Sequence, residues 1–322
     1  MRLICLTACV VLFPVSINAE VSTKISAIAG NVAQGLGDGE VKEVIATELS
    51  NYIIGEINTG LNFIEDRALL NTNFTHIGLS LGADSFGLDA GDTGFTGELM
   101  SVYRLYEDET MFIFNQSSLS HFNDRTTANT GLGARYITPD EKMIFGVNAF
   151  YDYEVEAKHK RTGVGVEFLT SMFEVRANRY KALSGYINYN GINEAALDGR
   201  DLKLTANLPY FYSSNLYYKD SQWEDGVGYA TNTEEFGLSA ELLPNTHFTI
   251  ASQQQDAGER QQVVSFQYTI PLGTAVGRTK KIQDGRWSTS LTPIREKLYE
   301  PVQRENRIMK KSINLGVTVS GY

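Results

Sequence analysis

Apolar and polar side chains alternate in about a dozen consecutive segments between residues 72 and 272. In the segment MIFGVNAFYD (143–152), every second side chain from Met143 to Tyr151 is apolar and falls on one face. A repeat of two residues is typical of β-strands. Strands of soluble domains usually have about five or six residues, whereas a tilted strand needs about nine to eleven to cross a bilayer. The long segments therefore predict an all-β fold, a twelve-stranded antiparallel transmembrane β-barrel.

Twelve is an even number of strands, as bacterial single-chain barrels require. The predicted strands are 72–86, 95–107, 109–122, 126–138, 141–154, 159–170, 172–182, 199–208, 211–219, 233–243, 246–255 and 261–271. Every second connection is a tight turn, and most of the others are longer, especially 183–198 and 220–232. Short turns at one end and long loops at the other are typical of the periplasmic and extracellular ends of a barrel.

Charged and amide side chains of these strands fall on the parity opposite to the apolar residues, which would line the lumen. A charge that faces lipid at mid-depth costs about 2–4 kcal/mol, so such segregation is expected of a barrel. The candidate lumen residues are Glu98, Arg104, Arg135, Asn148, Asp152, Arg161, Glu167, Glu174, Arg176, Asn178 and Glu241. We expect them to pair with one another, to hold a chain that passes through the pore, or to steer a solute.

A soluble β-sandwich would show the same alternation, because it buries the apolar face that a barrel turns towards lipid. The long strands and the alternating loop lengths favour the barrel. Aromatic residues near strand ends favour it as well, because such rings suit the membrane–water boundary. The residues expected at this boundary are Phe122, Tyr136, Tyr151, Tyr180 and Tyr218.

Residues 1–19 have the features of a secretory signal peptide with a cleavage site after Ala19. A lipoprotein site at Cys9 is the alternative, but it would leave too short an apolar stretch. Both cysteines lie in this segment, so the mature chain would have none and cannot be a thiol enzyme. The net charge of −10 argues against nucleic-acid binding, and no later apolar run predicts a transmembrane helix.

The remaining residues divide into three parts. Residues 20–70 are predicted to form a helical periplasmic segment, because apolar residues recur there at spacings of three and four. Residues 71–272 would form the barrel, and 273–322 a linker that returns into the pore. Within this linker, 287–306 could form a helix, and 312–322 could instead form a strand.

Six short motifs occur in order along the chain: TGLGAR (130–135), GVNAFYD (146–152), KRTGVGVE (160–167), ANRY (177–180), ANLP (206–209) and PVQRENRI (301–308). Together they resemble the β-barrel of the intimin/invasin family, the inverse autotransporters. The resemblance implies a periplasmic N-terminus and a chain that threads the pore to the outside after the last strand. It also implies a role for Arg304, Glu305 and Asn306 in that linker. The adhesion domains of the family would follow, yet the sequence ends at Tyr322 without one.

The expected function is that of an outer-membrane anchor or translocator for the C-terminal segment. The expected partners are outer-membrane lipid, the barrel-assembly machinery, and a separately encoded passenger or a host surface. A small passive channel is the alternative, with cation preference from an acidic lumen. An enzyme is disfavoured: His121 lies near Ser118 and Ser120, but adjacent residues point to opposite faces of a strand. We predict no cofactor and no metal site.

Overall fold

The computed structural model describes residues 73–84, 94–122, 125–208, 214–243, 246–271 and 290–313. The predicted signal peptide (1–19) and the predicted helical segment (20–70) lie outside the described residues. No helix in the described ranges is long and apolar enough to span a membrane.

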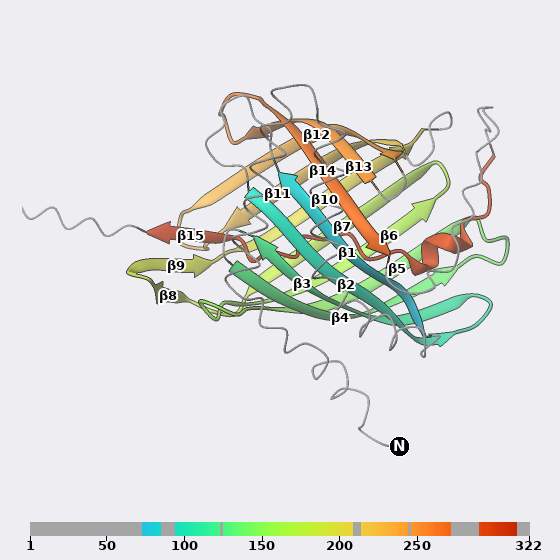
Figure 1. The fold of residues 1–322 in the computed structure, drawn as a ribbon, viewed down its shortest axis with the longest axis horizontal. Helices are drawn as coiled ribbons and strands as arrows, with labels where there is room; N and C mark the ends of the chain where they lie inside the picture. Colours follow the sequence, from blue (N-terminus) through green and yellow to red (C-terminus); the bar gives the residue numbers. More distant parts are fainter. Residues whose placement is uncertain are drawn as a thin grey trace, which may run out of the picture. The chain divides into compact units, whose positions relative to one another are not determined.

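Twelve strands form one antiparallel sheet. They are β1 (Phe74–Asp84), β2 (Gly94–Glu107), β3 (Met111–Phe122), β4 (Arg125–Ile137), β5 (Met143–Glu154), β6 (Lys160–Thr170), β7 (Phe173–Ala182), β10 (Asp198–Asn207), β11 (Asn215–Glu224), β12 (Ala230–Leu243), β13 (Thr246–Gln255) and β14 (Gln261–Pro271). The last strand pairs with the first, from Gly78 opposite Pro271 to Ala83 opposite Phe266, and closes the sheet into a barrel. Figure 1 shows β14, in orange, beside β1, in blue. The predicted all-β antiparallel fold is therefore confirmed.

The predicted strands agree with these bounds to within three residues, except for 211–219. The long loop predicted at 220–232 is wrong, because β11 continues to Glu224 and β12 begins at Ala230. Residues 220–224 still alternate: Ser221 and Trp223 are buried, whereas the intervening side chains are less buried and polar. Outward side chains beyond the apolar belt need not be apolar, so polarity alone did not mark the end of the strand.

The predicted loop 183–198 contains a hairpin of two further strands, β8 (Tyr186–Tyr189) and β9 (Ile192–Ala196). The turn between them is Asn190-Gly191, with φ of 52° and 83°, as a two-residue hairpin turn requires. A third strand, β15 (Lys310–Ile313), pairs antiparallel with β9. This strand overlaps only the first two residues of the alternative strand at 312–322, and residues 314–322 lie outside the described part of the chain.

Burial alternates along the barrel strands, as β5 illustrates. Phe145 and Val147, at odd-numbered positions, are 49% and 59% exposed. Asn148 and Asp152, at even-numbered positions, are buried. The outward face is therefore the apolar one and the inward face is largely polar. Two of the expected boundary residues lie on the inward side instead. Tyr180 is 1% exposed and stacks on Trp223. Phe122 has the inward parity of β3, and the Arg307 guanidinium lies 4.5 Å from its ring centroid.

Candidate functional site

Residues 290–313, named here the inner segment, run from one end of the barrel to the other (Figure 1). At the end with the short turns, the amide of Ile294 donates to the carbonyl oxygen of Glu141 in the β4–β5 turn at 2.8 Å. At the end with the long loops, β15 pairs with β9. We call these the short-turn end and the long-loop end.

A helix was expected over residues 287–306. Only Arg295–Tyr299 is helical, as the short 3-10 helix η2, and the chain from 301 to 309 is irregular. Residue 287 lies outside the described part of the chain. The irregular backbone has few hydrogen bonds of its own, so its polar groups need partners from the barrel wall.

Apolar side chains pack the lumen near the short-turn end. The inner segment contributes Ile294, Leu298 and Val302, all nearly fully buried. They join a cluster from the wall that comprises Val102, Phe112, Phe114, Ile137, Ile144, Phe150 and Leu169. The parity of the strands predicted a lumen lined by polar side chains. Several inward positions of β2 to β6 are apolar instead. This cluster fills the lumen near the short-turn end with apolar side chains.

Arg135 on β4 is fully buried and binds both the wall and the inner segment. Its Nε and Nη2 atoms donate to Glu167 at 3.0 and 2.8 Å. Its Nη1 atom donates to the carbonyl oxygens of Leu298, at 2.8 Å, and Glu300. One wall guanidinium thus supplies hydrogen-bond donors to two backbone carbonyls of the inner segment.

Two side chains of β7, Glu174 and Arg176, continue the ionic contacts of Arg135 and Glu167. Glu174 accepts from Lys297 of the inner segment and from Arg176 of the same strand. Arg176 also lies 3.5 Å from Glu167. These groups form a charge-paired network that is almost wholly buried.

Asp152 on β5 is the second ionic anchor of the inner segment. Its two carboxylate oxygens accept from Nη1 and Nη2 of Arg304 at 2.8 and 2.6 Å. The same carboxylate accepts from Nε of Arg161 at 2.8 Å, and Arg161 donates from Nη2 to the carbonyl oxygen of Glu305 at 2.6 Å. Gly163 leaves room for this arrangement, because a Cβ there would lie 3.2 Å from Nη2 of Arg304.

Amide and hydroxyl groups of the wall bind the backbone between these anchors. Gln116 accepts from the amide of Val302 at 2.7 Å and donates to its carbonyl oxygen at 3.4 Å. Asn178 donates to the carbonyl oxygen of Gln303 at 3.2 Å, and the Tyr180 hydroxyl accepts from the amide of Glu305 at 2.8 Å. These contacts replace water as partners of an irregular backbone.

Two of these wall residues were missed at the sequence level. Gln116 lies on the inward parity of β3, a strand for which no lumen candidate was named. Tyr180 shares the parity of Glu174, Arg176 and Asn178, so the signal for its inward orientation was present. It was assigned instead to the membrane boundary because it is aromatic and near a strand end.

The other predicted lumen residues lie as follows. Glu98 accepts from Asn306 at 2.5 Å, so the last residue of the predicted linker triplet also contacts the wall. Asn148 is buried beside Gly165. Glu241 is partly buried on β12, opposite His247 of β13.

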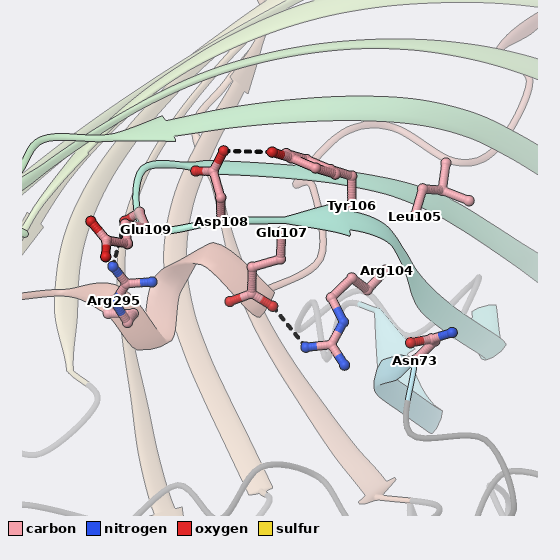
Figure 2. A pocket seen from close by; sticks show the side chains of 8 residues that line it. All are labelled: Asn73, Arg104, Leu105, Tyr106, Glu107, Asp108, Glu109 and Arg295. Atoms are coloured by element: carbon pink, nitrogen blue, oxygen red, sulfur yellow. Dashed lines mark hydrogen bonds and ion pairs between the residues drawn. The ribbon is translucent and has the colours of Figure 1, made fainter.

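Arg104 lies at a pocket of about 610 Å³ at the short-turn end. Figure 2 shows Arg104 directed at Glu107, 2.7 Å away, and Tyr106 directed at Asp108. The second guanidinium at the pocket, that of Arg295, binds Glu141 at 2.6 Å. Both cations therefore have carboxylate partners.

The inner segment is fastened again at the long-loop end. Lys310 binds Glu154 of the wall, and Arg125 bridges Glu154 and Glu194 at 2.8 and 2.7 Å. Glu194 belongs to β9, which pairs with β15. Ion pairs and strand pairing thus hold the β8–β9 hairpin, the wall and the inner segment together.

Asp225, in the β11–β12 turn, fastens the far end of the inner segment by accepting from Lys311 at 3.1 Å. Hydrogen bonds from the Val227 and Tyr229 amides, together with Lys311, lower the pKa of this carboxyl to about 2. A depressed carboxyl pKa stabilises the fold above the unfolded value of about 3.9, and this contribution is lost as the pH falls through the folded value.

We therefore expect this turn to stay closed from neutral pH to about pH 4 and to open as the pH falls towards about 2. Hydrogen exchange of the Val227 and Tyr229 amides, measured against pH, checks this. Asp225→Asn should remove the acid-dependent step, and a step that persists in this variant would assign it to another group.

Comparison with known proteins adds a family to this geometry. The sequence model described as "Inverse autotransporter, beta-domain" matches residues 24–306. An attaching and effacing protein homolog of Escherichia coli strain K12 is 32% identical over 135 residues, which are 40% of this chain and 45% of that protein. Intimin of Escherichia coli O127:H6 is 23% identical over 252 residues, 71% of this chain and 25% of intimin.

The chain spans less than half the length of these relatives. A solved structure from work titled "Unveiling the Mechanism Behind the in-meso Crystallization of Membrane Proteins" is similar in fold. Its TM-score is 0.59 at 20% sequence identity, over 74% of this chain and all of that chain. The match to the family covers most of the sequence, including the twelve barrel strands and most of the inner segment. The chain therefore belongs to the inverse autotransporters and contains their beta-domain.

Proposed function

We propose that this barrel is an outer-membrane anchor that holds its own C-terminal segment across the membrane, from the periplasm to the cell surface. The carrying observation is the course of the inner segment, which is bound to the β4–β5 turn at the short-turn end and to β9 at the long-loop end. Short turns are typical of the periplasmic side and long loops of the extracellular side. This polarity supports passage outward.

The lumen contacts support a holding role for the wall. In a membrane, every backbone polar group needs a partner, and an irregular chain has few of its own. Arg135, Gln116 and Asn178 supply such partners, and Asp152 binds the Arg304 side chain. The same groups close the pore to solutes, so they favour an anchor over an open channel.

The surfaces outside the lumen suggest the partners of the barrel. Outer-membrane lipid would surround the apolar outward belt, and the barrel-assembly machinery would insert the strands. Intimin and a second relative, named "Inverse autotransporter adhesin YeeJ", suggest surface display, so we propose that the C-terminal segment or the long loops face a host surface or a separately encoded passenger. We propose no catalytic role: Ser120 donates to Glu98, and His121 contacts Thr126.

A tag placed after Tyr322 should react with an impermeant label on intact cells, because the inner segment would deliver residue 322 to the surface. A tag inserted in the β4–β5 turn at Asp140 is the matched periplasmic control and should react only after permeabilisation. A tag at Gly226, in the β11–β12 turn, is the surface control. Labelling of Tyr322 only in permeabilised cells would contradict the proposed topology.

A further inference from the structure

The outward face of β6, β7 and β10 carries a group of cations near the long-loop end. Arg179 on β7 and Arg200 on β10 are both exposed, as are Lys160 and Lys181. The strand registers place Arg179 directly opposite Arg200, and Lys181 opposite Thr162 of β6. We name Lys160, Arg179, Lys181 and Arg200 the outer basic cluster.

Two arginines in direct cross-strand register repel each other. Side chains in such positions lie about 4.5–5.5 Å apart at Cβ, and like charges there are destabilising. No ion pair to a carboxylate joins Arg179 or Arg200 within the described ranges, whereas Lys181 binds Asp198. The repulsion between the two guanidinium groups would be relieved by an anion bound between them.

Apolar side chains continue from the cluster towards the short-turn end on the same face. Val164, which lies opposite Arg179, is 58% exposed, and Val166 follows it on β6. Leu202 and Leu204 continue the face below Arg200 on β10. The face is therefore amphipathic along its length, with apolar side chains towards the short-turn end and the arginines Arg179 and Arg200, which have no carboxylate partner in the described ranges, towards the long-loop end.

We propose that this face binds a phosphorylated glycolipid of the outer leaflet, with its phosphate groups at the outer basic cluster and its acyl chains along the valines and leucines. Guanidinium groups bind phosphate through paired, charge-assisted hydrogen bonds, and two of them side by side can hold one phosphate group. The neighbouring face is of opposite charge, since Asp220 and Glu234 lie in register on β11 and β12. These carboxylates would repel the anionic headgroup and so confine it to the face of β6, β7 and β10.

The test uses the full-length protein, purified in detergent and titrated with three lipids by native mass spectrometry. The lipids are bisphosphorylated lipid A, its dephosphorylated form, and phosphatidylglycerol. Wild-type protein should bind bisphosphorylated lipid A most tightly. Arg179→Gln/Arg200→Gln should weaken this binding about tenfold to thirtyfold, since each cation near an anionic surface contributes about 1 kcal/mol.

The matched control is Lys142→Gln/Arg260→Gln, which removes the same charge from two loop positions away from the cluster. It should leave the affinity unchanged, and heat-modifiable gel mobility should show that both double variants are folded. Equal affinity of wild type and the arginine variant would overturn the proposal. Equal binding of dephosphorylated lipid A would exclude phosphate recognition, and tighter binding of phosphatidylglycerol would exclude a glycolipid.

Discussion

Truncation after residue 289 should convert a closed barrel into a conducting one. The inner segment contributes Ile294, Leu298 and Val302 to the apolar cluster in the lumen. Its backbone also forms hydrogen bonds with the side chains of Arg135 and Gln116. Without it, the polar wall of a twelve-stranded barrel would be free to hydrate. Single-channel conductance in planar bilayers should rise by at least about tenfold, because a charged, water-filled lumen conducts ions.

The matched control is truncation after Ile313, which removes residues 314–322 and keeps the whole inner segment. The single-channel conductance of this protein should remain as low as that of the full chain. A full-length protein that already conducts, and does so equally after truncation at 289, would contradict closure of the lumen by the inner segment and would favour the passive-channel alternative.

Asp152→Asn should loosen the inner segment more than any other single wall substitution. The carboxylate of Asp152 binds both Arg161 and Arg304, and all three side chains are at most 1% exposed. Its removal leaves two buried guanidinium groups without their shared anion, and breaking a buried pair in this way costs about 3–5 kcal/mol. Limited proteolysis within the inner segment, measured against denaturant, should show the loss.

Asp140→Asn is the control, since Asp140 is an exposed turn carboxylate and such groups contribute about 0–1 kcal/mol. The double variant Asp152→Asn/Arg304→Gln should recover part of the loss, because it removes one of the two stranded charges. Equal protection of the inner segment in wild type and Asp152→Asn would show that this ion pair does not hold it.

The parity of side chains along each strand predicts much of the barrel from the sequence alone. Arg135, Asp152 and Glu174 were placed on the inward parity because lipid penalises charge, and the structure buries all three inside. The alternating connection lengths predicted a short-turn end and a long-loop end, and the family resemblance implied that the C-terminal chain threads the pore between them. These features are local or periodic, so they can be read from neighbouring residues.

Contacts between distant residues could not be read in this way. The pairing of β15 with β9 joins Lys310 to Ala196, and nothing in either strand encodes the other. The apolar cluster in the lumen was missed because an inward apolar side chain breaks the parity rule unless a segment from elsewhere covers it. Gln116 was missed because its partner, the backbone of Val302, has no sequence signature.

The wall binds many peptide groups of the inner segment, and this has a consequence for the proposed passage of a chain through the pore. Arg135 binds carbonyl oxygens of Leu298 and Glu300, and Gln116 binds both backbone groups of Val302. Every residue except proline offers the same two groups, so these sites do not discriminate between most side chains. On the proposed function, a chain that passes through the lumen would meet the same partners at each non-proline residue, and side-chain anchors such as that of Arg304 would fix its final position.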